Sequence, residues 1–142
     1  MGNILFIDAS SNTIASYTYD AQGRVIQTEG ANGSNPKTLI YSSDNVQVGD
    51  PNTSATDTYQ FLISHGIMKV ASITDTDGAK QTFEYDANGY PSKVTAKNGT
   101  ITTSTYNARG LLVSRTENAG TASARTTLTE WHPDYRKPVK PN

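Results

Sequence analysis

The sequence has no cysteine, few charged side chains and no long apolar segment. Without cysteine, the chain can form neither disulfides nor thiolate metal sites. Its longest apolar runs, Ile4–Ile7 and Phe61–Ile63, are far shorter than the roughly 20 residues of a membrane-spanning helix, so we expect no membrane span. Hydrophobic residues make up 35% and charged residues 18% of the chain, both less than is usual in globular domains. Polar residues and glycine take their place, which favours strands and turns over helices.

The balance of charges indicates no class of binding partner. Twelve basic residues face thirteen acidic ones, and the signs are interspersed, so nothing directs the protein toward nucleic acid or an anionic membrane. The N-terminus also lacks the basic start and apolar stretch of a signal peptide. We therefore expect Met1 to precede an internal segment of a longer protein, whose export would be directed from elsewhere.

A repeated pentapeptide is the main positive signal. Three segments read Tyr, Asp or Asn, Ala, any residue, Gly, and they are Tyr19–Gly23, Tyr85–Gly89 and Tyr106–Gly110. Glycines separated by 21 residues extend the match, as in the pairs Gly2 and Gly23, Gly78 and Gly99, and Gly99 and Gly120. A period of about 21 residues therefore runs through the chain.

Two weaker units fill the gap between the clear ones. We call the position before each turn the tyrosine slot, and assign it to Tyr19, Tyr41, Phe61, Tyr85 and Tyr106. Asn45 follows Tyr41 as the best substitute for a left-handed glycine, whereas Gly66 follows Phe61 one residue late. A sixth unit would end at Trp131.

The residue types of one unit predict a hairpin. The Asp20 side chain can accept hydrogen bonds from the next backbone N–H groups, and Gly23 supplies positive φ at the exit of a type I turn closed by a glycine bulge. The same roles are expected for Asp86, Gly89, Asn107 and Gly110. Residues before the turns alternate, as half-buried strands do. We expect each tyrosine ring to pack on the matching ring of the next unit, while its hydroxyl reaches a polar partner.

These features predict an all-β, mainly antiparallel array of hairpin repeats with essentially no helix. The array should occupy residues 1–130, with a loop inserted near residues 49–57 where Pro51 cannot serve a central strand. Residues 131–142 contain three prolines and should form an extended tail.

The repeats resemble those of the RHS/YD-repeat family, whose unit ends in Tyr-x-Tyr-Asp-x-x-Gly-Arg. Tyr17–Val25 matches best, Phe83–Gly89 follows closely, and Thr129–Arg136 is similar to a stretch of bacterial RHS proteins. Later units depart from the pattern, because Tyr90 and Leu111 replace the arginine. The resemblance implies a secreted or cell-surface scaffold, one slice of a β-shell that encloses a C-terminal toxin, as in bacterial polymorphic toxins and insecticidal toxin complexes; teneurins share the architecture.

No catalytic or metal site is expected. His65 and His132 stand in turn-like contexts without a nucleophile or carboxylate cluster, and Asp75–Gly78 resembles a calcium loop only at its start. No cofactor is therefore predicted.

Two other functions remain open. A carbohydrate-binding sheet could stack sugars on exposed rings, for which the candidates are Tyr17, Phe83 and Trp131. A protein-interaction or adhesion role is the third reading. The partners of a scaffold would be the rest of the parent protein and its toxin domain. An isolated strip would self-associate through its edges or its apolar face.

Overall fold

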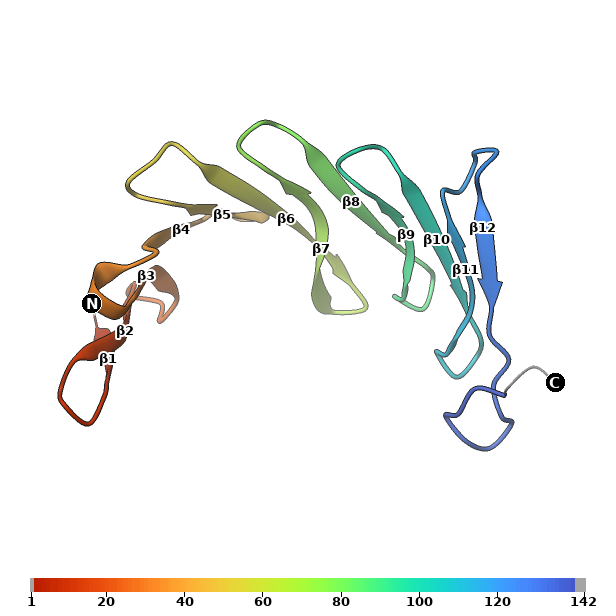
Figure 1. Ribbon diagram of the computed structural model, residues 1–142, viewed down its shortest axis with the longest axis horizontal. Coiled ribbons are helices and arrows are strands. Elements are labelled where there is room, and N and C mark those ends of the chain that lie inside the picture. Colours follow the sequence, from red (N-terminus) through yellow and green to blue (C-terminus); the bar gives the residue numbers. More distant parts are fainter. Residues whose placement is uncertain (1, 140–142) are drawn as a thin grey trace. The chain divides into compact units, whose positions relative to one another are not determined.

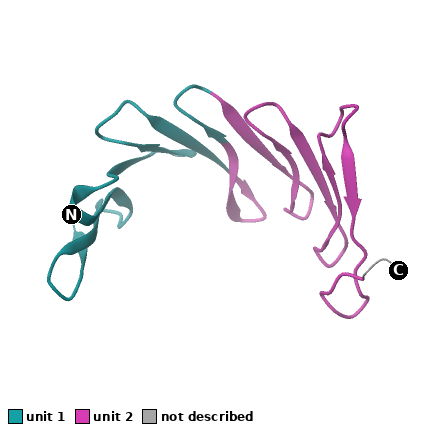
Figure 2. Ribbon diagram, in the orientation of Figure 1, with its two compact units in different colours: residues 1–61, 73–78 teal, residues 62–72, 79–142 magenta. Residues whose placement is uncertain are grey.

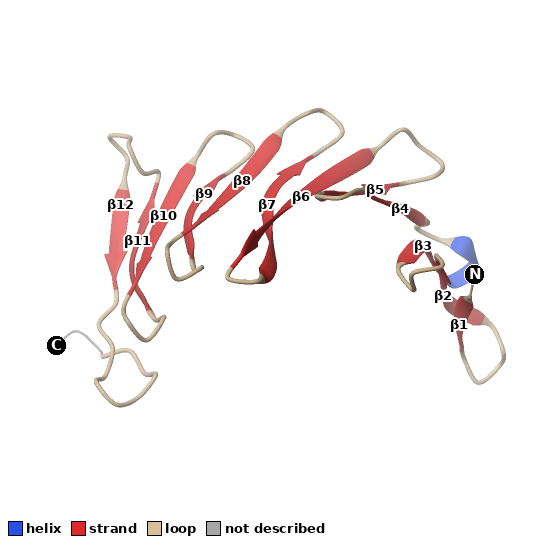
Figure 3. Ribbon diagram, turned by 180° about the vertical axis from the view of Figure 1, so that it is seen from behind, coloured by secondary structure: helices blue, strands red, loops and turns tan. Residues whose placement is uncertain are grey.

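The computed structural model describes residues 2–139, which form antiparallel β-strands paired in chain order (Figures 1 and 3). The twelve strands are β1 (Asn3–Ile7), β2 (Thr13–Tyr19), β3 (Val25–Gly30), β4 (Lys37–Tyr41), β5 (Asn45–Gly49), β6 (Thr56–Ser64), β7 (Ile67–Thr74), β8 (Lys80–Tyr85), β9 (Pro91–Thr95), β10 (Ile101–Tyr106), β11 (Leu112–Glu117) and β12 (Arg125–Leu128). Over residues 2–139 the only helical element is one turn of 3-10 helix, η1 (Ala31–Gly33). The predicted all-β hairpin array is therefore confirmed.

The chain divides into two compact units (Figure 2). Unit 1 comprises residues 1–61 and 73–78, and unit 2 comprises residues 62–72 and 79–142. Within unit 1 the hairpins β1–β2, β2–β3 and β4–β5 follow one another, and within unit 2 the pairing runs without interruption from β8 to β12. Short turns and neighbouring partners make each unit a simple meander.

A bulge accompanies each clear repeat turn. Tyr19 lies opposite Val25 although Thr18 lies opposite Gln27, so one residue of β3 has no partner. The same shift occurs where Tyr85 meets Pro91 and where Tyr106 meets Leu112. Such bulges increase the local twist and re-aim side chains. At the slot residues, where the turn begins, the regular pairing between the two strands is therefore interrupted.

Very little of the chain is fully buried. Between residues 2 and 139, Leu111 is the buried hydrophobic residue and Ser72 the buried polar one. Half-buried side chains, rather than an enclosed core, hold the strands in place.

Two boundaries differ from the sequence-based expectation. The loop expected over residues 49–57 is shorter, because Gly49 still belongs to β5 and β6 begins at Thr56. The C-terminal segment is not simply extended, since Trp131 forms an isolated bridge with Pro138 and the His132 amide donates to the Lys137 carbonyl at 2.9 Å. Residues 140–142 of the expected tail lie outside the described residues. No helix among residues 2–139 has the length and apolar character needed to cross a membrane.

Candidate functional site

Three turns share one hydrogen-bond pattern. Oδ1 of Asp20 accepts from the backbone N–H groups of Gln22 and Arg24 at 3.0 and 2.9 Å, and the Gly23 N–H donates to the Asp20 carbonyl at 3.1 Å. Asp86 and Asn107 accept in the same way from the residues two and four positions later. The turn glycines have φ of 77°, 82° and 71° for Gly23, Gly89 and Gly110. Aspartate and asparagine serve equally because the pattern uses only Oδ1.

A fourth turn of this kind escaped the sequence reasoning. Asp8 accepts from the N–H groups of Ser10 and Asn12 at 2.8 and 3.0 Å, and Ser11 takes the glycine position with φ of 64°. Its slot residue is Ile7, which shows the same register shift as Tyr19. The signal available was the Asp8-Ala9 pair, which matches Asp20-Ala21. Serine in place of glycine concealed it.

The Asp20 carboxylate is stabilised in its ionised form. The hydrogen bond from the Arg24 backbone N–H, followed by the side-chain contact with Arg24, lowers the pKa of Asp20. Nε of Arg24 lies 2.7 Å from Oδ2. A carboxyl group whose pKa is lowered by folding stabilises the native state above its unfolded pKa of about 3.9 and loses that contribution as pH falls through the folded value.

Asp20→Asn should therefore remove part of the acid sensitivity of folding. Asparagine keeps the Oδ1 acceptor, as Asn107 does, but cannot be protonated in this range. We expect the wild type to lose stability relative to the variant as the pH drops below about 4. Urea unfolding at a series of pH values would measure this, with the exposed Asp134→Asn as control. Parallel pH profiles for wild type and Asp20→Asn would contradict the assignment.

Except for Phe61, each later residue at this position donates a side-chain hydrogen bond to the strand that follows the preceding turn. The Tyr41 hydroxyl donates to the Val25 carbonyl at 2.7 Å within unit 1. In unit 2 the corresponding bonds run from Tyr85 to Val70 at 2.8 Å, from Tyr106 to Pro91 at 3.0 Å, and from the Trp131 indole N–H to Leu112 at 2.7 Å. Trp131 thus makes the contact that tyrosine makes elsewhere. We call these four residues the aromatic ladder.

The rings of the ladder do not stack on one another as expected. Cζ of Arg24 lies 4.4 Å from the Tyr41 ring centroid, and Nζ of Lys69 lies 4.8 Å from that of Tyr85. The Tyr90 ring lies 5.0 Å from the Tyr106 ring at 30°. Arg24 and Tyr90 are the residues that follow the turn glycines, so one repeat supplies the cover for the aromatic ring of the next. Cation–π or ring contact can fill that role.

Two expected slot residues behave differently. Tyr19 ends β2, and its amide donates to the Gly2 carbonyl at 3.1 Å within unit 1. Phe61 lies three residues before the end of β6, where His65 and Gly66 form a tight turn with φ of 54° and 71°. Phe61 is therefore not adjacent to its turn, because the strand continues to Ser64.

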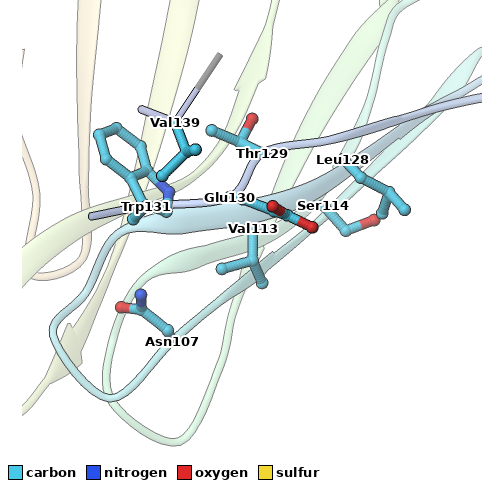
Figure 4. A pocket seen from close by; sticks show the side chains of 8 residues that line it. All are labelled: Asn107, Val113, Ser114, Leu128, Thr129, Glu130, Trp131 and Val139. Atoms are coloured by element: carbon cyan, nitrogen blue, oxygen red, sulfur yellow. The ribbon is translucent and has the colours of Figure 1, made fainter. Parts of the chain in front are cut away.

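The three candidate sugar-stacking residues lie on different elements of the fold. Tyr17 lies in unit 1, where its ring makes an edge contact with Phe6 at 5.8 Å and 83°. Phe83 lies in β8, opposite Val94 of β9. Trp131 follows β12 and lines a cavity of about 600 Å³ together with residues of β11, β12 and the C-terminal segment (Figure 4). Only Trp131 of the three contributes to this cavity.

Arg109 holds the C-terminal loop beside this cavity. Its guanidinium donates to the carbonyls of His132 at 2.8 Å, of Pro133, and of Tyr135 at 3.5 Å. The Asp134 N–H donates to Nδ1 of His132 at 3.1 Å, and the rings of His132 and Tyr135 lie 4.8 Å apart. These contacts account for the folded loop where an extended tail was expected.

The remaining candidates for chemistry occupy turns. Nδ1 of His65 lies 3.0 Å from the Ser64 hydroxyl, a contact between chain neighbours. In the stretch resembling a calcium loop, the Gly78 N–H donates to the Asp75 carbonyl at 3.0 Å, which is a hairpin-turn bond. Over residues 2–139 no three His, Asp or Glu side chains gather as a metal site would require.

Comparison with known proteins places the chain in a family. It is similar to a crystal structure of TcdB2-TccC3, at 13% identity and a TM-score of 0.40, over 91% of this chain and 10% of that one. A structure of TcdB2-TccC3-TEV gives 11% identity and a TM-score of 0.38, over 93% and 11%. The chain thus spans about a tenth of the chains that it matches. No curated protein matches. The family model of the teneurin YD-shell matches residues 2–123, so the chain belongs to the teneurin YD-shell family, as the RHS/YD-like repeats indicated.

Proposed function

We propose that this chain is a non-enzymatic scaffold, a wall segment of a YD shell that encloses a C-terminal toxin or effector domain of the same exported protein. The aromatic ladder carries the proposal. Backbone carbonyls of neighbouring strands accept a hydrogen bond from the side chain of each ladder residue, Tyr41, Tyr85, Tyr106 and Trp131. Side chains used in this way bind one hairpin to the next rather than a substrate.

The exposed apolar side chains suit a segment that is covered by other parts of a larger protein. Every residue of β1 is exposed, and its side chains Ile4, Leu5, Phe6 and Ile7 have exposed fractions from 49 to 60%. Edge strands of this kind invite pairing with another strand. The rest of the parent protein would supply that cover, and the isolated chain would self-associate instead.

Protease protection in the full-length parent protein tests the enclosure. We would compare the wild type with Tyr85→Ala/Tyr106→Ala, which removes two steps of the ladder, and follow cleavage of the region C-terminal to the repeats. The control is Thr105→Ala, because Thr105 is exposed and belongs to the same strand as Tyr106. We expect protection in the wild type and the control, and rapid cleavage in the double variant.

Two outcomes would count against the proposal in different ways. Rapid cleavage of the C-terminal region in all three proteins, the wild type included, would rule out enclosure and leave an adhesion role. Unchanged thermal stability of the double variant would show that the ladder does not hold the wall together. Export of the parent protein can be followed in the same experiment by assaying the culture medium or the cell surface.

A further inference from the structure

The loop that follows Trp131 contains a turn with a titratable acceptor. We call residues 132–137 the clasp. The clasp is closed by a hydrogen bond from the His132 N–H to the Lys137 carbonyl at 2.9 Å, and within it the Asp134 N–H donates to Nδ1 of His132 at 3.1 Å. Nδ1 can accept this bond only while the ring is neutral, because both nitrogens of a protonated histidine are donors.

Other turns of the chain make the same bond with an oxygen acceptor. In six of them an Oδ1 accepts from the backbone N–H two residues later at 2.8 to 3.0 Å, and the acceptors are Asp8, Asp20, Asp50, Asp86, Asn98 and Asn107. Asparagine does not titrate, and an ordinary aspartate is protonated only below about pH 4. Histidine changes its charge between about pH 5 and 8. The clasp therefore combines the geometry of these turns with an acceptor that mild acid removes.

A proton on His132 would also enter a positive environment. The Arg109 guanidinium, from the turn between β10 and β11, donates to the His132 carbonyl at 2.8 Å and to two further carbonyls of the clasp. The charged groups on the clasp and on the elements packed against it are three cations and two carboxylates, namely Arg109, Arg136, Lys137, Glu130 and Asp134. Another cation on His132 adds repulsion at the moment when the hydrogen bond is lost. The Tyr135 ring, 4.8 Å from the imidazole, can contact either protonation state.

We propose that the clasp is an acid-sensitive switch, which is closed while His132 is neutral and opens when Nδ1 of His132 takes up a proton from solvent. Opening breaks the bond between His132 and Lys137 and the bridge between Trp131 and Pro138, so the Trp131 ring becomes more exposed. Val139, which lines the same cavity as Trp131, is released with the clasp (Figure 4). The switch does not depend on whether the wall encloses a toxin.

The fluorescence of Trp131, the single tryptophan, follows the opening. We would measure its quenching by acrylamide in the full chain between about pH 8 and pH 5 at constant ionic strength. Quenching should increase in a one-proton transition as the pH falls, with the ratio of open to closed clasp rising about tenfold. The circular dichroism spectrum of the same samples should stay that of a β-protein, because only the clasp responds.

Two matched variants test the role of His132. In His132→Asn, the asparagine Oδ1 can accept the Asp134 N–H as in the six turns with oxygen acceptors, and it does not titrate. Quenching of this variant should stay at the low level of the neutral wild type throughout the pH range. His65→Asn makes the same change at the other histidine, where asparagine tolerates the φ of 54°, and should keep the wild-type transition.

Several results would overturn the switch. They are wild-type quenching that does not change with pH, a wild-type transition retained in His132→Asn, or a transition abolished in His65→Asn. Strong quenching of His132→Asn at every pH would show that the bond to the Asp134 N–H does not close the clasp. Loss of the β spectrum over the same range would mean that the whole fold responds to acid.

Discussion

Replacement of Tyr85 by alanine is expected to lower the free energy of unfolding by about 3 kcal/mol, at the low end of aromatic-to-alanine changes because the ring is only half-buried. Three contacts disappear together, which are the ring packing, the cover by Lys69 and the hydrogen bond to the Val70 carbonyl. Burial raises the pKa of the Tyr85 hydroxyl, so the group remains a protonated donor at neutral pH. Urea unfolding followed by circular dichroism measures the loss.

Two milder changes separate these contributions. Tyr85→Phe keeps the ring and should cost about 1 kcal/mol for the hydrogen bond alone. Lys69→Met keeps an apolar cover but removes both the charge over the ring and the hydrogen bond that Nζ donates to the Gly89 carbonyl, and should cost about 1–2 kcal/mol. A Tyr85→Ala variant no less stable than Tyr85→Phe would show that the ring itself contributes nothing, contrary to the ladder.

Gly110→Ala is expected to cost about 3 kcal/mol, roughly three times the cost of Gly23→Ala. Both glycines have positive φ, so an alanine at either position carries the strain of the left-handed region. At Gly23 an added Cβ would meet nothing within 4 Å, whereas at Gly110 it would lie 2.6 Å from Cζ of Tyr90. The Tyr90 ring can move only by leaving Tyr106, on which it packs.

A double variant isolates the clash. In a Tyr90→Ala background, Gly110→Ala should cost only about 1 kcal/mol, the backbone strain that remains. The comparison needs four proteins and equilibrium unfolding in urea. Equal costs for Gly110→Ala in the two backgrounds would mean that Tyr90 does not lie against the turn.

The parts of the fold that depend on neighbouring residues could be predicted from the sequence. The aspartate and glycine of a turn act within five residues, so their spacing in Tyr19–Gly23 and Tyr85–Gly89 indicated hairpins, and the residues between them alternated as strands do. The β-strand over Arg125–Leu128 likewise agreed with the threonines in that segment.

Contacts between distant residues could not be predicted in the same way. The residue that covers a ring lies 16 or 17 positions before it and changes its chemistry from Arg24 to Lys69 to Tyr90. Arg109 reaches carbonyls 23 to 26 residues later, and no local pattern announces such a bond. The cavity depends on that loop, so only Trp131 among its residues was singled out as a binding candidate in advance.

The cover of each ring by the preceding repeat decides where this array can be cut and rejoined. A segment exchanged at the intervening turns, Asn32–Gly33 or Asn98–Gly99, would separate Arg24 from Tyr41, or Tyr90 from Tyr106, and join covers to rings that they did not evolve with. Recombination between repeats, natural or engineered, should succeed best when the exchanged piece runs from a covering residue to the ring that it covers. Such a piece begins directly after one turn glycine, as at Gly89, and ends where the next turn begins, as at Tyr106.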